Sequence, residues 1–134
     1  MGNSHQLLLT VLPGTYAIAR FAPDANIAVP YSRGFFYSVT KTEDELSLVC
    51  EEKLLAADMK AERGRTLLRV ESTLAFSLTG IVASLAVPLA EAAVSIFAVS
   101  TYDTDYLLVN ENDLGRATAA LEQAGHRVQR RTLE

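Results

Sequence analysis

The sequence predicts an α+β protein in which antiparallel sheets carry their helices on one face. Two observations support this class. Residues 65–131 alternate strand and helix patterns in the order βαββαβ, and a weaker copy of part of that pattern occurs earlier in the chain. A length of 134 residues allows one compact domain or two small interlocked ones. We predict a degenerate unit over residues 1–61 and a complete unit over residues 62–134.

The first half predicts strands with little helix. LLLTVL from Leu7 and YAIARF from Tyr16 are apolar runs joined by a turn at Pro13 and Gly14. The segment PDANIAVPYSRG contains two prolines and can form at most two helical turns. Residues 52–63 fit a short helix and an irregular connection equally well.

The second half predicts each element more clearly. Residues 65–72 alternate as a strand, and 94–100 with 105–109 form a hairpin around the turn 101–104. Residues 78–92 predict an apolar helix that Ser77 or Thr79 can cap, with a kink or break expected near Val87 because of Pro88. A second helix follows Asn110 and ends at Gly125, and a last strand starts at His126. This order is that of the ferredoxin-like unit.

The earlier copy lies sixty residues before the hairpin. At that shift Tyr37 aligns with Phe97, Val39 with Val99, and Glu45 with Asp105. In both stretches an acidic turn is followed by Leu-Val and then, after one further residue, by Glu. The sequence therefore predicts two ferredoxin-like units in tandem, the N-terminal one degenerate.

Composition limits the function classes. The net charge of −4 disfavours a nucleic-acid partner, because phosphate binding requires clustered Lys and Arg. Cys50 is the only cysteine, so neither an intramolecular disulfide nor a Cys-based metal site is expected. The uncharged stretch 72–90 is diluted by polar residues and flanked by Glu71 and Glu91, which predicts a buried helix and no membrane span. The N-terminus lacks the basic flank of a signal peptide, so we expect a cytoplasmic protein.

No catalytic motif is present, and we predict a non-enzyme that needs no cofactor. His5 and His126 are expected to be exposed polar residues, and Cys50 a buried, inert thiol. An enzyme using Asp103, Asp105 or Glu45 is the disfavoured alternative, because no pair with separable acid and base roles is visible.

One polar constellation is a candidate ligand site. In βαββαβ topology the start of the first helix and the hairpin turn lie at the same end of the fold. That would bring the N–H groups around Thr79, Gly80 and Ile81 near the acidic turn at Asp103 and Asp105. A free amino acid carries both a carboxylate and an ammonium group, which suit these two features. The alternative is that Thr79 is only a cap and Asp103 only a turn former.

Several strings in the chain, among them DELSLVCEE, AFSLTGIVASLAVPLAEAAVSIFAVSTYDTDYLLV and ENDLGRATAALEQAGHRV, resemble small bacterial ACT-domain proteins with two ACT-like modules. The resemblance implies a regulatory or sensor protein related to arginine sensors and aspartate kinases, which binds a small molecule such as an amino acid. It also implies side-by-side pairing, here as a homodimer. Position 93 is alanine where the family often has glycine. The ligand-binding residues implied are Ser77, Thr79, Gly80, Ile81, Ser95, Ile96, Phe97, Thr101, Asp103 and Asp105. The alternative function is a ligand-free interaction module that regulates a partner enzyme.

Overall fold

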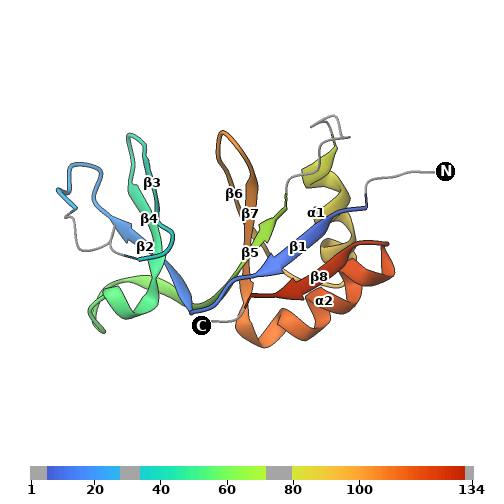
Figure 1. Ribbon diagram of the computed structural model, residues 1–134. Helices are drawn as coiled ribbons and strands as arrows, with labels where there is room; N and C mark the ends of the chain where they lie inside the picture. The colour runs from blue at the N-terminus through green and yellow to red at the C-terminus, as the bar shows by residue number, and fades with distance from the viewer. Residues whose placement is uncertain (1–5, 28–33, 72–79, 132–134) are drawn as a thin grey trace. The chain divides into compact units, whose positions relative to one another are not determined.

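The structure is a computed structural model that describes residues 6–27, 34–71 and 80–131. The chain divides into two compact units. Unit 1 contains Met1–Pro13 and Thr66–Glu134, and unit 2 contains Gly14–Arg65 (Figure 1). The division into two related units over residues 1–61 and 62–134 stays a prediction. The observed units differ from it in placing the first residues of the chain with the C-terminal half.

Unit 1 contains a βαββαβ series with one additional strand. Its strands are ordered β6–β7–β5–β1–β8. Strand β1 pairs antiparallel with β5 and parallel with β8, so it lies between the first and last strands of the series. The elements, with their bounds, are β1 (Leu8–Val11), the end of β5 (Ala61–Val70), α1 (Ile81–Glu91), β6 (Phe97–Ser100), β7 (Asp105–Asn110), the 3₁₀ turn η3 (Glu111–Asp113), α2 (Leu114–Gln123) and β8 (Arg127–Arg130).

The core of unit 1 forms between one face of this sheet and the two helices. Alternate residues of each strand point to the helices, as the two-residue period of a strand requires. Helix α1 buries Ile81, Leu85 and Leu89, and α2 buries Ala117 and Leu121. The strand residues packed against them are Leu9, Val11, Leu68, Val70, Leu107 and Val109. This arrangement confirms the predicted α+β class with helices on one face.

Helix α1 continues through Pro88 from Ile81 to Glu91, so of the two predicted outcomes, a kink or a break, the break is wrong. Its N-cap residue is Gly80, and Ser77 and Thr79 lie outside the described residues. None of the helices in the described parts of the chain is long and apolar enough to cross a membrane.

Unit 2 is a smaller sheet with strand order β3–β4–β2–β5. Between Tyr16 and Ile18 of β2 the register against β5 shifts, because Tyr16 faces Arg65 and Ile18 faces Glu62. Gly64 lies within this bulge with φ of +70°, which glycine adopts without strain. Ala17, Ala19, Leu48 and Cys50 form the centre of its core. The elements are β2 (Tyr16–Phe21), β3 (Ser38–Lys41), β4 (Leu46–Glu51), the 3₁₀ turn η2 (Glu52–Leu54) and the start of β5.

The stretch 52–63, for which the sequence favoured neither alternative, is not an α-helix. It contains η2, a turn and the start of β5. The two apolar runs at 7–12 and 16–21 are strands as predicted. They do not pair with each other, because β1 belongs to unit 1 and β2 to unit 2.

The two hairpins are equivalent at a spacing of 59 residues, one fewer than the sequence alignment suggested. Ser38 pairs with Val49 in unit 2, and Phe97 pairs with Leu108 in unit 1. The 3₁₀ turns η2 and η3 begin at Glu52 and Glu111, again 59 apart. The alignment was shifted by one because short apolar strands match almost as well when displaced, whereas backbone pairing fixes the register.

Candidate functional site

The β6–β7 turn is held by its own threonines. The Thr101 amide donates to the Thr104 carbonyl at 2.8 Å, and the Thr104 amide donates to the Thr101 hydroxyl oxygen at 3.1 Å. The Ser100 hydroxyl donates to the carboxylate of Asp105 across the base of the turn. These bonds fix the direction of the turn and leave Tyr102 and Asp103 exposed at its tip.

Thr104 also connects the turn to β5. Its hydroxyl donates to the carbonyl of Val70, the last residue of that strand. The hairpin turn therefore lies at the end of unit 1 where β5 leaves the sheet. In Figure 1 the start of α1 lies towards the same end of this unit as the tip of the β6–β7 hairpin.

Helix α1 starts at Gly80 with an exposed, left-handed backbone. The φ of Gly80 is +87°, and its carbonyl accepts the first helical hydrogen bond, from the Ser84 amide at 2.9 Å. No side chain of a described residue caps this N-terminus. The first amides of a helix have no partner within it, and they favour an anion or water. Because Gly80 has no side chain, a ligand can approach the backbone closely there.

The predicted site residues fall into three groups. Thr101, Asp103 and Asp105 belong to the turn, and Gly80 and Ile81 belong to the start of α1. Ile81 is only 8% exposed and packs in the core, so only its backbone is available. Ser77 and Thr79 lie outside the described residues.

Ser95, Ile96 and Phe97 form the third group, at the opposite end of β6 from the turn. Thr101 lies five positions after Ile96 along the extended chain, roughly 16 Å at the usual rise of a strand. Ile96 packs against the core, whereas Ser95 and Phe97 are exposed. Within a single chain the structure does not bring these residues to the turn.

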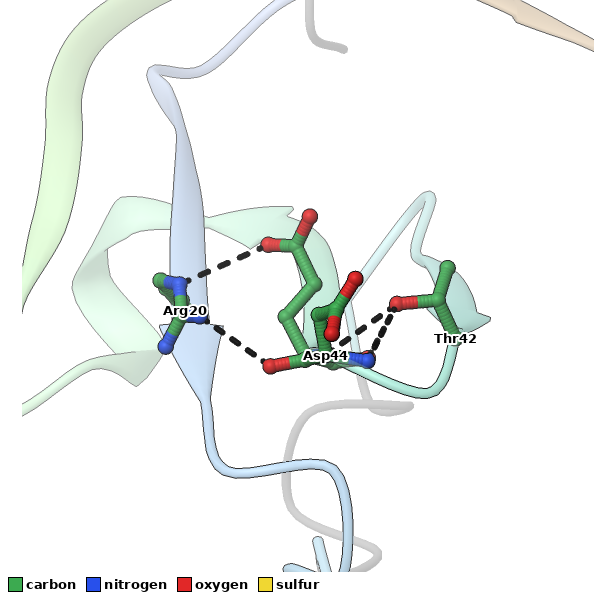
Figure 2. Close-up of polar contacts among 4 residues, drawn as sticks. Arg20, Thr42 and Asp44 are labelled. Atoms are coloured by element: carbon green, nitrogen blue, oxygen red, sulfur yellow. Dashed lines mark hydrogen bonds and ion pairs between the residues drawn. The ribbon is translucent and has the colours of Figure 1, made fainter.

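Unit 2 contains the equivalent turn with a different attachment. The Thr42 amide donates to the Glu45 carbonyl, and the Thr42 hydroxyl oxygen accepts from the Asp44 and Glu45 amides. Figure 2 shows Arg20 of β2 reaching this turn. Its guanidinium donates to the Asp44 carbonyl at 3.1 Å and lies 3.7 Å from the Glu45 carboxylate. A side chain of the protein itself thus occupies this end of unit 2.

The thiol of Cys50 is suited to packing. Its side chain is fully buried. Burial, together with the nearby negative charge of Glu51, raises the pKa of Cys50 to about 11, and Arg63 opposes this rise. The thiol is therefore protonated at neutral pH, and the thiol form is a poor nucleophile. Among the described residues no group of three His, Cys, Asp or Glu side chains is placed to hold a metal ion.

Sequence reasoning missed the roles of Thr104 and His126. The Thr-x-x-Thr spacing at 101–104 was a usable signal for a turn with side-chain hydrogen bonds. His126, expected to be exposed, is only 4% exposed. His126 follows the left-handed Gly125, and no sequence signal indicates that the chain turns inward after this glycine.

Comparison with known proteins places this chain in a family. The model of the ACT domain matches residues 60–123, and a model of an N-terminal domain matches residues 14–58. Among solved structures, protein Atu0741 from Agrobacterium tumefaciens is 36% identical, with 98% of each chain covered and a TM-score of 0.92. The ligand-free regulatory subunit of aspartate kinase from Thermus thermophilus shares the fold, with a TM-score of 0.58 at 12% identity over 83% of this chain and 93% of that one.

A human protein named cytosolic arginine sensor for mTORC1 subunit 1 is 35% identical over 103 residues. The match covers 69% of this chain and 31% of the sensor, so the chain spans about a third of that relative's length. The family match, the high identity to the bacterial relative and the ferredoxin-like unit 1 agree with one another. The chain belongs to the same family as the Agrobacterium protein, and its residues 60–123 match the ACT domain.

Proposed function

We propose that this chain is a non-catalytic regulatory or sensor protein of the cytoplasm that binds a small molecule, with an amino acid as the preferred ligand class. The observation that carries the proposal is the polar end of unit 1. There the exposed Gly80 starts α1, and Thr104 ties the acidic turn to the end of β5. The similarity to a protein named as an arginine sensor supports the ligand class.

The chemistry of this end suits a zwitterion. The first amides of α1 favour the ligand's carboxylate. The carboxylate of Asp103 is exposed at the tip of the turn and can receive an ammonium group. Ser77, Thr79, Ile81, Thr101 and Asp105 complete the proposed set of contacts. Unit 2 offers less room for a ligand, because Arg20 already contacts its turn.

A thermal-shift screen of the free amino acids tests the proposal. At a hundred times the dissociation constant a ligand stabilises the fold by about 2.7 kcal/mol, or a rise in Tm of roughly 10 °C for a chain of this size. Asp103→Asn should remove most of this rise. Asp44→Asn is the matched control, because Asp44 occupies the equivalent turn position 59 residues earlier. It should leave the rise intact.

Two results would contradict the amino-acid proposal. One is the absence of a shift with any amino acid at millimolar concentration. The other is a shift that Asp44→Asn abolishes and Asp103→Asn leaves unchanged, because binding would then involve unit 2. Both variants change exposed side chains. Without ligand, the free energy of unfolding of each should therefore lie within about 0.5 kcal/mol of the wild-type value.

We also propose that two copies pair through an apolar edge of unit 1. Among the described strands β6 pairs only with β7 and so forms an edge, and its four residues carry no charge. Phe97 on β6 and Val82 and Val87 on α1 are exposed by 37%, 41% and 54%. An unprotected edge strand and exposed apolar side chains each favour association. In this proposal Ser95, Ile96 and Phe97 belong to the paired edge.

The same edge supports the second candidate, a ligand-free module that regulates a partner enzyme. This alternative predicts a stable complex in a pull-down with the tagged chain and no thermal shift with any small molecule. The sensor proposal predicts the thermal shift, whether or not a partner is captured.

A further inference from the structure

His126 is a buried titratable residue that the proposed function does not use. Both nitrogens of its ring contact backbone groups of other elements. The Leu7 amide donates to Nδ1 at 3.1 Å, and Nε2 lies 3.0 Å from the Ser84 carbonyl oxygen. The ring therefore connects the residue before β1 to the first half of α1, in unit 1.

The contact with Ser84 explains how α1 accommodates its proline. In an α-helix the Ser84 carbonyl would accept from the amide of residue 88, and Pro88 has no amide hydrogen. A buried carbonyl without a donor is costly. Nε2 of His126 lies at hydrogen-bond distance from this same carbonyl, so the histidine replaces the donor that the proline lacks.

These two contacts define the form of the ring. Nδ1 can accept the Leu7 amide only when it carries no hydrogen, which places the hydrogen of the neutral ring on Nε2. An imidazolium ring carries hydrogens on both nitrogens. Protonation would therefore keep the bond to Ser84 and remove the bond to Leu7.

No charged side chain of the surrounding elements is buried with the ring. Strand β1 and residues 6 and 7 carry none, and Gln6 is the polar side chain beside Gly125. The charged residues of α1, α2 and β8 are exposed, whereas the ring is buried; they are Glu91, Arg116, Glu122, Arg127 and Arg130.

We infer that His126 is a proton-sensitive clamp, which completes the hydrogen bonding of α1 at Pro88 and holds the start of β1 only while its ring is neutral. Acidification then releases Leu7 and loosens the first strand of the chain, while α1 keeps its additional donor. This inference does not depend on the proposed ligand or on pairing of two copies.

A double-mutant cycle tests the helix half of the clamp. His126→Ala should raise the unfolding equilibrium constant about tenfold at neutral pH, because the Ser84 carbonyl loses its donor. In a Pro88→Ala background residue 88 donates its own amide, so the same change should have an effect several-fold smaller. Equal effects in the two backgrounds would overturn this half. If His126→Ala does not fold alone, the inference predicts that Pro88→Ala restores folding, and failure of that rescue counts against it.

Nuclear magnetic resonance of the full ¹⁵N-labelled chain tests the proton half, that is, how protonation acts on the clamp, as the pH is lowered from about 8 to 5. We expect the hydrogen on Nε2 at the upper end, and a loss of Leu7 amide protection of about tenfold or more as the ring gains a proton. The Val94 amide, which donates to Leu89, is the internal control and should stay protected. In His126→Gln, whose side chain can donate and accept without titrating, Leu7 protection should not depend on pH.

Three results would overturn the proton half. They are a hydrogen on Nδ1 of the neutral ring, unchanged Leu7 protection while the ring titrates, and a ring that stays neutral until the whole protein unfolds in acid.

Discussion

The hydroxyl of Thr104 and the guanidinium of Arg20 hold equivalent turns by different chemistry. Thr104 donates a short, partly buried hydrogen bond to the end of β5. Arg20 donates to the Asp44 carbonyl and pairs with Glu45, and the charged side chains of this pair are 49% and 42% exposed. Exposure decides which attachment contributes more, because water screens the pair in unit 2.

Removing each attachment should therefore have unequal effects. We expect Thr104→Val to lower the free energy of unfolding by about 1 kcal/mol, since a partly buried carbonyl loses its donor. Arg20→Ala should lower it by about 0.5 kcal/mol or less, as is usual for exposed pairs. Urea unfolding at neutral pH measures both. A larger loss for Arg20→Ala would show that the exposed pair, and not the partly buried hydroxyl, is the stronger attachment.

Ala93 adopts a backbone conformation that alanine disfavours. It follows α1 with φ of +61°, the left-handed region in which glycine is at ease. The resemblance to ACT domains implies glycine at this position, and glycine would suit the conformation in which the chain leaves α1 towards β6. The Arg116 side chain donates to the carbonyls of Ala92 and Ala93 and helps to hold the exit.

Ala93→Gly should stabilise the protein. Relieving the backbone strain of a left-handed alanine raises the free energy of unfolding by about 1–2 kcal/mol. The greater freedom of glycine in the unfolded chain removes about 0.5–1 kcal/mol of that gain. We expect a net gain of roughly 0.5–1 kcal/mol in the free energy of unfolding, measured by urea or thermal unfolding. Ala92→Gly, at a position with negative φ, is the control and should destabilise. A loss of stability in Ala93→Gly would contradict this explanation.

At the scale of elements, hydrophobic periodicity predicted the second half well. The hairpin, the second helix and the last strand are present, and Asn110 caps the 3₁₀ turn η3, which precedes α2. Periodicity failed where a distant group changes the outcome. A proline within a helical pattern predicts a kink or a break, whereas the nitrogen that contacts the Ser84 carbonyl belongs to His126, 42 residues after Ser84. The left-handed conformation of Ala93 also follows from its tertiary setting.

The exposed edge of unit 1 gives the prediction at this scale. Phe97→Lys places a charge on an edge strand, a change that opposes strand pairing between molecules. We expect the wild type to elute at about twice the chain mass of 14.5 kDa in gel filtration with light scattering, and the variant at the chain mass. Val39→Lys, on the edge strand β3 of unit 2, is the matched control and should stay dimeric. A wild type that is monomeric at every concentration would contradict the pairing proposal.

At the scale of the whole molecule, the sequence predicted two units but not how the chain is divided between them. Strand β1 inserts between β5 and β8 of unit 1, after which the chain forms unit 2 and returns through the long strand β5. Leu9 and Val11 are apolar enough for either unit, so composition could not assign them. The strands with which β1 pairs decide its unit. Those strands are far away in the sequence, so a local pattern carries no information about them.

The candidate site was predictable only in part. Topology alone indicated that the helix start and the hairpin turn share one end of unit 1, and the bond from Thr104 to Val70 fixes the turn at the end of β5. Periodicity gave no reason to separate Ser95, Ile96 and Phe97 from that end. Their separation follows from the direction of β6: the strand begins at the opposite end of the sheet and runs towards the turn.

The central claim is that the start of α1 and the β6–β7 turn bind one small molecule together. Amide chemical shifts of the ¹⁵N-labelled chain, recorded as an amino acid that stabilises the protein is added, test it most directly. The account predicts saturable changes at both Gly80 and Asp103, with the equivalent turn of unit 2 at Asp44 unmoved. Saturable changes at Asp44 with none at Gly80 or Asp103, or no change anywhere, would contradict it.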